Sequence, residues 1–316
     1  MYAAKTLILP MISILLNMGT TSCKHKRLCF PDTGSVQIRF DWSALTPEDD
    51  KPGSMRVVFF DTDGRGIVND LSHEGGTIHI PDGRYHVVAY NNDSETLLFK
   101  EEELRERCRA YTRYTDLMFN PLSERKIAGI SADKLYHLFP DRGYRAESES
   151  ETIIDTDYRE ITLYPIRYTH TVATLCTHIE APSEIIDMRL VLLDVPIEYA
   201  LGMGMPASVR GNMLVQTILL SPASLGRSRS VTEMFGQAST DGYLGASAKV
   251  MAHYRNGGTT VIVAPITTDM VTIRDPYHAE IIINHQIRKP EPIAGGSGFN
   301  ATIEEWVDAE IKPLPL

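Results

Sequence analysis

A two-residue alternation of apolar and polar side chains constrains the fold of this chain more than any other feature. Within residues 34–42, Val36, Ile38 and Phe40 alternate with polar residues, and this period is typical of a strand with one buried face. Further strands, some alternating and some with continuous apolar runs, are predicted at 55–60, 76–80, 84–90, 169–175, 188–192, 213–219, 259–263, 278–283 and 299–306. Strands separated by turns, with almost no alternation of strands and helices, predict antiparallel sheets packed as sandwiches.

Turns and a few short helices are predicted between these strands. Pro81-Asp82-Gly83 is expected to close a hairpin between 76–80 and 84–90, with Gly83 at positive φ. A charge-rich run at 141–157 is expected to be a solvated connector. The two segments expected to be helical are 101–111 and 131–138.

The strands form two series, one on each side of a break near residues 150–168. A chain of 316 residues is long enough for two domains that each bury a core. We therefore predict an all-β protein with two tandem antiparallel β-sandwich domains and short helices. The predicted N-terminal sandwich covers residues 34–158, and the predicted C-terminal sandwich covers residues 159–316.

The N-terminus has the composition of an export signal. Lys5 precedes a largely apolar run at residues 6–18, which is followed by small residues. A transmembrane helix needs about 20 apolar residues, so this run is too short to span a bilayer. We predict a signal peptide at 1–22; the alternative is a buried N-terminal helix.

Cys23 follows the predicted cleavage region directly, as the cysteine of a bacterial lipobox does. We expect cleavage between Ser22 and Cys23 and acylation of the Cys23 thiol, which would anchor the protein in a membrane through residues 23–33 as a tether. The alternative is an ordinary signal peptide with Cys23 paired to Cys29. Cys108 and Cys176 are expected to be small packing residues.

No sequence motif for catalysis is present, so we predict a protein that is not an enzyme and that has no cofactor. Asp61-Thr-Asp-Gly64 has only part of a calcium loop and is expected to be a turn. His170, Cys176 and His178 share one strand face by parity, which leaves a zinc site as a minor alternative. The net charge of −10 argues against a nucleic-acid partner.

Several segments, taken in order, resemble one known family. They are Ile80-Pro-Asp-Gly-Arg-Tyr85, Tyr90-Asn-Asn, Tyr164-Pro-Ile-Arg-Tyr-Thr-His170 and the closing Gly298-Phe-Asn-Ala-Thr-Ile-Glu-Glu-Trp306. Together with the lipobox, they are similar to the fimbrillin-like lipoproteins of Bacteroidales, the type V pilus superfamily, and especially to its fimbrial anchor and accessory subunits.

The resemblance implies two transthyretin-like sandwiches and a structural or adhesive role in the assembly or anchoring of fimbriae at the outer membrane. Other fimbrial subunits are the implied partners, joined by strand addition to an open sheet edge. Lys24-His-Lys-Arg27 leaves open whether the protein faces the surface or the periplasm. The alternative is a glycan-binding lipoprotein of a polysaccharide-uptake system, although Trp42 and Trp306 both have strand alternation typical of core residues.

Overall fold

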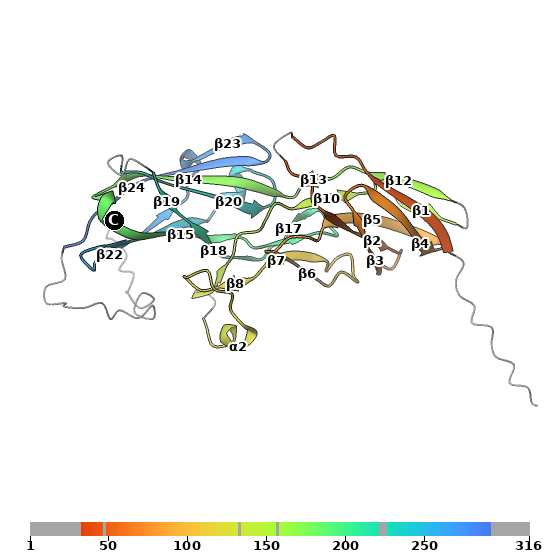
Figure 1. Cartoon of the computed structure of the whole chain (residues 1–316), viewed down its shortest axis with the longest axis horizontal. Helices are drawn as coiled ribbons and strands as arrows, with labels where there is room; N and C mark the ends of the chain where they lie inside the picture. Colours follow the sequence, from red (N-terminus) through yellow and green to blue (C-terminus); the bar gives the residue numbers. More distant parts are fainter. Residues whose placement is uncertain (1–32, 47–48, 132–133, 156–157, 221–225, 292–316) are drawn as a thin grey trace, which may run out of the picture.

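The structure is a computed structural model that describes residues 33–46, 49–131, 134–155, 158–220 and 226–291. Strands dominate these residues and build several sheets, so the prediction of an all-β protein is confirmed. The first half of the chain lies at one end of the long axis and the second half at the other (Figure 1). No described helix is long and apolar enough to cross a membrane.

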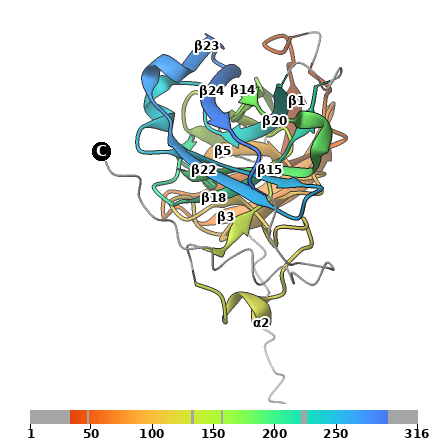
Figure 2. The same cartoon turned by 90° about the vertical axis from the view of Figure 1, so that its left-hand side faces the viewer.

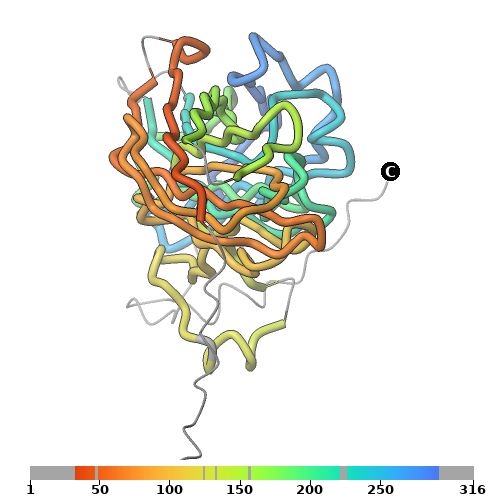
Figure 3. Tube along the Cα trace, turned by 90° about the vertical axis from the view of Figure 1, so that its right-hand side faces the viewer, coloured from red at the N-terminus to blue at the C-terminus, as the bar shows by residue number. Residues whose placement is uncertain are grey.

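The first half builds one large sheet in the order β12-β1-β4-β3-β2-β5-β10-β13, with β11 also paired to β5. The segments expected to be strands in this half did form strands, whereas their pairing, β1 with β4 and β2 with β5, follows from the structure alone. Figure 3 looks along the long axis onto these strands. The strands are β1 (Thr33–Phe40), β2 (Ser54–Phe60), β3 (Gly66–Ser72), β4 (Gly75–Pro81), β5 (Gly83–Asn91), β10 (Tyr144–Glu147), β11 (Thr152–Ile154), β12 (Arg159–Leu163) and β13 (Ile166–Arg167).

This sheet folds back on itself, because β3 and β4 pair only at their turn, through Ser72 and Gly75. Beyond the turn the two strands separate, so that β12-β1-β4 forms one wall and β3-β2-β5 forms part of the other. Apolar side chains from both walls fill the space between them. The buried members of this first core are Val36, Ile38, Phe40, Trp42, Met55, Val57, Phe59, Ile78, Ile80, Tyr85, Val87, Ala89, Tyr144, Ala146, Ile154, Ile161 and Leu163.

The predicted hairpin between 76–80 and 84–90 is wrong. β4 pairs with β1, whereas β5 pairs with β2, so the chain crosses from one wall to the other at residue 82. Gly83 does not have a positive φ; the tight turn lies earlier, where Gly75 has φ 101°. Both strands carry apolar residues for the same core, and packing that core from two sides requires them to lie on opposite walls.

The second half, together with two short strands at residues 114–115 and 136–137 of the first half, builds two sheets that face each other across a second core. One has the order β19-β20-β14-β24-β23, and the other has the order β22-β21-β15-β18-β9-β8. Their strands are β8 (Tyr114–Thr115), β9 (Tyr136–His137), β14 (Thr169–Ile179), β15 (Ile185–Pro196), β18 (Arg210–Gln216), β19 (Ile218–Leu219), β20 (Ser228–Phe235), β21 (Ser247–Tyr254), β22 (Thr259–Pro265), β23 (Val271–Asp275) and β24 (His278–Ile287).

A fourth sheet combines strands from both halves in the order β17-β16-β7-β6. In addition, β12 and β13, which lie after residue 158, pair with β1 and β10 of the first half. Strand pairing therefore crosses the position at which we divided the chain, and the division itself stays a prediction. The strands of the fourth sheet are β6 (Leu97–Lys100), β7 (Arg109–Thr112), β16 (Glu198–Ala200) and β17 (Met205–Pro206).

The two predicted helices are not formed as predicted. Residues 101–111 make turns and then β7, and β9 lies within 131–138; the short α2 (Glu124–Ile127) lies on an excursion that projects from the body (Figures 1 and 2). The predicted connector at 141–157 contains β10 and β11, and Arg145 within it is buried. In each case, pairing with a distant strand outweighs the local preference of the sequence.

Candidate functional site

A third hydrophobic core lies at the junction between the two halves. β2 and β5 use one face for the first core and the opposite face for this one, which the β17-β16-β7-β6 sheet covers. Both halves of the chain contribute to it. The buried members of this shared core are Val58, Phe60, Val88, Tyr90, Leu97, Cys108, Ala110, Tyr168, Tyr199, Leu201 and Phe235.

A group of charged residues, largely buried except for Arg142, lies beside the shared core. Arg167 on β13 is 2% exposed, and its Nη2 donates to both carboxylate oxygens of Glu233 on β20, at 3.0 and 3.1 Å. Its Nη1 donates to Asp49 in the first half at 3.4 Å, and Asp49 also accepts from Arg142 at 3.2 Å. Thr171 donates to Glu233 at 2.6 Å. We call Arg167, Asp49, Glu233 and Arg142 the ionic clamp.

The ionic clamp joins three separate parts of the chain. Asp49 follows β1, Arg167 lies between the halves, and Glu233 lies on β20 of the second half. Removing one partner from a buried group of this kind leaves an uncompensated charge, which is strongly destabilising. The clamp is therefore a structural link between these parts. None of its members was predicted from the sequence as a site residue.

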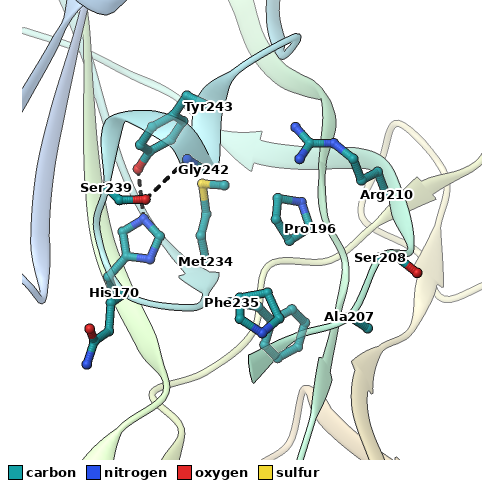
Figure 4. Close-up of a pocket in the computed structure, with 12 residues that line it drawn as sticks. His170, Pro196, Ala207, Ser208, Arg210, Met234, Phe235, Ser239, Gly242 and Tyr243 are labelled. Carbon is teal, nitrogen blue, oxygen red and sulfur yellow. Dashed lines mark hydrogen bonds between the residues drawn. The ribbon is translucent and has the colours of Figure 1, made fainter. Parts of the chain in front are cut away.

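A pocket of about 200 Å³ lies between the second-half sheets and is drawn in Figure 4. His170 on β14 forms two hydrogen bonds there: Nδ1 with the Gly236 carbonyl at 2.9 Å and Nε2 with the Tyr243 hydroxyl at 2.7 Å. Because a carbonyl can only accept, Nδ1 carries the proton and Nε2 accepts from Tyr243. Ser239 accepts from the Gly242 amide at 3.2 Å.

Burial lowers the pKa of His170, and the imidazole is therefore neutral at pH 7. Burial also raises the pKa of Tyr243, so its hydroxyl stays protonated and can donate to the ring. No Asp, Glu or Cys lines this pocket among the residues that the structure describes. The His170–Tyr243 pair therefore satisfies buried polar atoms and has no carboxylate here that would orient the histidine as a base.

The first core is incompletely covered where β3 and β4 separate. On that side β3 has no strand partner among the described residues except at the turn, and neither does β4. Ile67 and Leu71 of β3 lie opposite Phe59 and Met55, and both are only partly buried against the first core. We call the facing edges of β3 and β4 the open edge.

Asn69 lies between Ile67 and Leu71 on the inward face of β3, opposite Val57. Its Nδ2 is buried and has no hydrogen-bond partner. A buried donor without an acceptor is costly, and native structures contain few of them. The open edge therefore combines an unpaired strand, accessible apolar side chains and an unused amide donor.

Several predicted site residues lie outside the described residues. They are Ser22 and Cys23 with the signal peptide 1–22, most of the tether 23–33, Cys29, the basic run at 24–27 and the last predicted strand with Trp306. Cleavage and acylation at Cys23 therefore stay predictions.

The structure does not bring the three residues of the zinc alternative together on one face. A register shift between Cys176 and His178 leaves Cys176 buried and turns His178 outward. Asp61 accepts from the amides of Asp63 and Arg65 within its own turn, as expected for a solvated turn. Among the described residues, no three His, Cys, Asp or Glu side chains are placed to hold a metal ion.

The two described cysteines are free and buried, as predicted for packing residues. Cys108 lies in the shared core near the Tyr90 hydroxyl, and Cys176 lies in the second core. Burial raises the pKa of each thiol to about 11, so both are protonated and unreactive at neutral pH.

Residues 22–213 match the model of one family, described as "Domain of unknown function (DUF5119)". A protein of Bacteroides ovatus named "Putative fimbrium anchoring subunit Fim4B" is 37% identical over 151 residues. This match covers 46% of the present chain and 43% of that protein. The chain therefore spans less than half of the length of this curated relative.

Solved structures with a similar fold come from species of Bacteroides and Porphyromonas. A "putative adhesin" of Bacteroides ovatus has a TM-score of 0.62 and 17% identity, and the match covers 82% of this chain and 94% of that one. "Putative polysaccharide binding proteins (DUF1812)" of Bacteroides thetaiotaomicron have a TM-score of 0.52 and 8% identity, and the match covers 80% of this chain and 92% of that one. "The fimbrial anchor protein Mfa2" of Porphyromonas gingivalis has a TM-score of 0.50 and 13% identity, and the match covers 79% of this chain and 90% of that one.

Proposed function

The chain belongs to the family described as DUF5119, and from this premise we propose that it is a structural subunit that anchors fimbriae at the outer membrane. The predicted resemblance to fimbrial anchor subunits of Bacteroidales is confirmed by the named relative, and the solved adhesin and anchor structures share the fold. These relatives are named for anchoring and adhesion, which supports the proposal of a structural role without enzymatic activity.

The open edge is the observation that carries the proposal. An extended segment of another fimbrial subunit adds to β3, and its backbone pairs with the unpaired edge of that strand. Its apolar side chains cover Ile67 and Leu71, and one of its carbonyl groups accepts from the unused Nδ2 of Asn69. The docked strand thus completes both the sheet and the first core.

Attachment to the membrane is the second part of the proposal. Cleavage before Cys23 and acylation of its thiol would put the lipid at the new N-terminus, with the tether between the lipid and β1. Because several acyl chains on one residue give a durable anchor, the folded body is held at the outer membrane. We also propose that the two halves are transthyretin-like sandwiches arranged in tandem.

The glycan-binding alternative gains no support from Trp42. Sugar sites use exposed aromatic rings as platforms, whereas Trp42 is 9% exposed and its Nε1 donates to the His73 carbonyl at 2.8 Å; the exposed aromatic rings among the described residues are Tyr158 and Tyr164, at 62% and 52%. A neighbour named for polysaccharide binding is only 8% identical, and that likeness concerns the fold alone.

Asn69→Leu tests docking at the open edge because stability and binding should change in opposite directions. Replacing the unsatisfied buried amide by an apolar side chain is expected to raise the free energy of unfolding by about 1–2 kcal/mol. The same change should weaken binding of the purified fimbrial stalk subunit from the same bacterium about tenfold, since the docked carbonyl loses its donor. Urea titration and surface plasmon resonance measure the two effects.

Val68→Thr is the matched control, because Val68 lies on the same strand but points away from the first core and is 39% exposed. It should bind the stalk subunit within about twofold of the wild type. Wild-type affinity in Asn69→Leu, with the expected gain in stability, would mean that subunits do not add at the open edge.

A further inference from the structure

We infer that the two halves of this protein fold and unfold as one unit. Residues 97–115 belong to the first half, and they form hydrogen bonds both with the rest of that half and with the second half. We call this segment the strap; it contains β6, β7 and β8. The inference is independent of the proposed fimbrial role, since it concerns only contacts within the chain.

The strap is bound tightly to the first half. Arg56 on β2 donates from Nη1 to both carboxylate oxygens of Glu102, at 2.9 and 3.0 Å, and Tyr90 on β5 donates its hydroxyl to the same carboxylate at 2.5 Å. The backbone adds two bonds, because the Gly66 amide donates to the Glu103 carbonyl and the Arg105 amide donates to the Gly64 carbonyl. The strap therefore cannot leave the first half without breaking a partly buried charged contact.

The same strap is bound to the second half through its other edge. β7 pairs antiparallel with β16, in the register Glu198 with Tyr111 through Ala200 with Arg109. The Leu201 amide continues this pairing by donating to the Cys108 carbonyl at 3.0 Å. The ammonium group of Lys100 lies 2.5 Å from the Glu198 carboxylate, which adds an ion pair across the junction.

The chain beyond β7 extends the link into the second half's own sheet. β8 pairs with β9, and β9 pairs in parallel with β18, where Tyr136 lies beside Asn212 and His137 beside Met213. Leu117 and Tyr136 then pack on Val191, Leu214 and Met251 of that sheet. A segment that precedes the first half's last strands is thus built into the second half.

The shared core is divided between the halves. Tyr90 and Phe60 come from the first half, Cys108 and Ala110 from the strap, and Tyr199 from the second half. All are buried, so separating the halves would expose apolar side chains on both sides at once. Separation would therefore remove buried apolar contacts from both halves, in addition to the first and second cores that each half has.

The backbone of the second half lies close against the strap at Gly202. A Cβ atom at this position would lie 1.9 Å from the Arg105 carbonyl oxygen, and the Arg105 Nε also donates to the Gly202 carbonyl at 3.1 Å. Any side chain at Gly202 must therefore push the second half away from the strap. Gly202→Ala is the substitution that tests the junction most selectively.

Three native probes report on the three cores during unfolding of the full chain in urea. Trp42 fluorescence reports on the first core, in a Trp306→Phe background that leaves one tryptophan. Thiol labelling resolved by peptide mass spectrometry reports on Cys108 in the shared core and Cys176 in the second core. We expect the three midpoints to agree within about 0.2 M urea, as one cooperative transition requires. A midpoint for Cys176 that differs by about 1 M or more from that of Trp42 would overturn the inference.

Gly202→Ala and Gly129→Ala form a matched pair for the junction. Gly129 lies near α2, and a Cβ there would be 3.7 Å from its nearest neighbour, which is ordinary contact. In native buffer, Gly202→Ala is expected to speed labelling of Cys108 at least about tenfold, whereas Gly129→Ala should change it less than about twofold. Unchanged labelling of Cys108 in Gly202→Ala would show that the strap does not hold the halves together.

Discussion

Replacing Arg167 by methionine is expected to lower the free energy of unfolding by about 3–5 kcal/mol. The substitution leaves Asp49 and Glu233 without their common partner, and their side chains are only 3% and 14% exposed. Asp49 keeps Arg142, but Glu233 loses its ion-pair partner; methionine fills much of the space of the arginine stem, so lost packing contributes less than the charge left on Glu233. Urea unfolding followed by circular dichroism at pH 7 measures the change.

Arg274→Met is the control for the ionic clamp, because Arg274 forms a comparable pair with Glu280 at 2.8 Å on the surface. Its side chain is 65% exposed, and solvent reduces the contribution of such a pair to below about 0.5 kcal/mol. A second test adds Asp49→Asn and Glu233→Gln to Arg167→Met, which should recover more than half of the lost stability. A loss below about 1 kcal/mol in Arg167→Met alone would contradict the role of the clamp.

Cys23→Ala is expected to move nearly all of the protein from the membrane fraction to the soluble fraction of the cell envelope. Without the thiol no acyl chains can be attached, and the body alone has no described helix able to span a membrane. Immunoblots of separated membrane and soluble fractions measure the change.

Cys29→Ala is the matched control and should leave the protein in the membrane fraction. The comparison also separates lipidation from the alternative of a Cys23–Cys29 disulfide, in which the two variants would behave alike. Recovery of Cys23→Ala in the membrane fraction would contradict acylation at this residue.

The strands that could be predicted from the sequence are those with enough residues to show their period. β1 alternates over its whole length, and β14 and β15 are long enough to be recognised although each contains a register shift. β2 and β5 appear as continuous apolar runs, Val57–Phe60 and Val87–Tyr90, because they are buried on both faces. Such runs indicate strands buried on both faces, and here the second face packs in the shared core.

The elements that could not be predicted depend on distant partners. β9, β16 and β17 have only two or three residues each, which is too short for a period to appear. The helix expected at 101–111 is absent because residues 109–112 pair with β6 and β16. The wrong hairpin has the same origin, since local turn chemistry at 81–83 does not say which wall each strand joins.

The members of the ionic clamp and the open edge carry no local sequence signal. Asp49 and Arg167 are 118 residues apart, and only the completed fold brings them together. Asn69 could have been noticed, because it interrupts the apolar residues Ile67 and Leu71 on one face of β3. That β3 has a free edge, however, depends on its separation from β4 and follows only from the sheet topology.

The most direct test of the central claim is the fraction of fimbriae that remain attached to cells lacking this gene. Fimbriae on washed cells and in the culture medium are counted by electron microscopy and quantified by immunoblot of the stalk subunit. The account predicts that deletion releases most fimbriae into the medium and that the wild-type gene restores attachment. Unchanged number, length and attachment of fimbriae in the deletion strain would contradict an anchoring role.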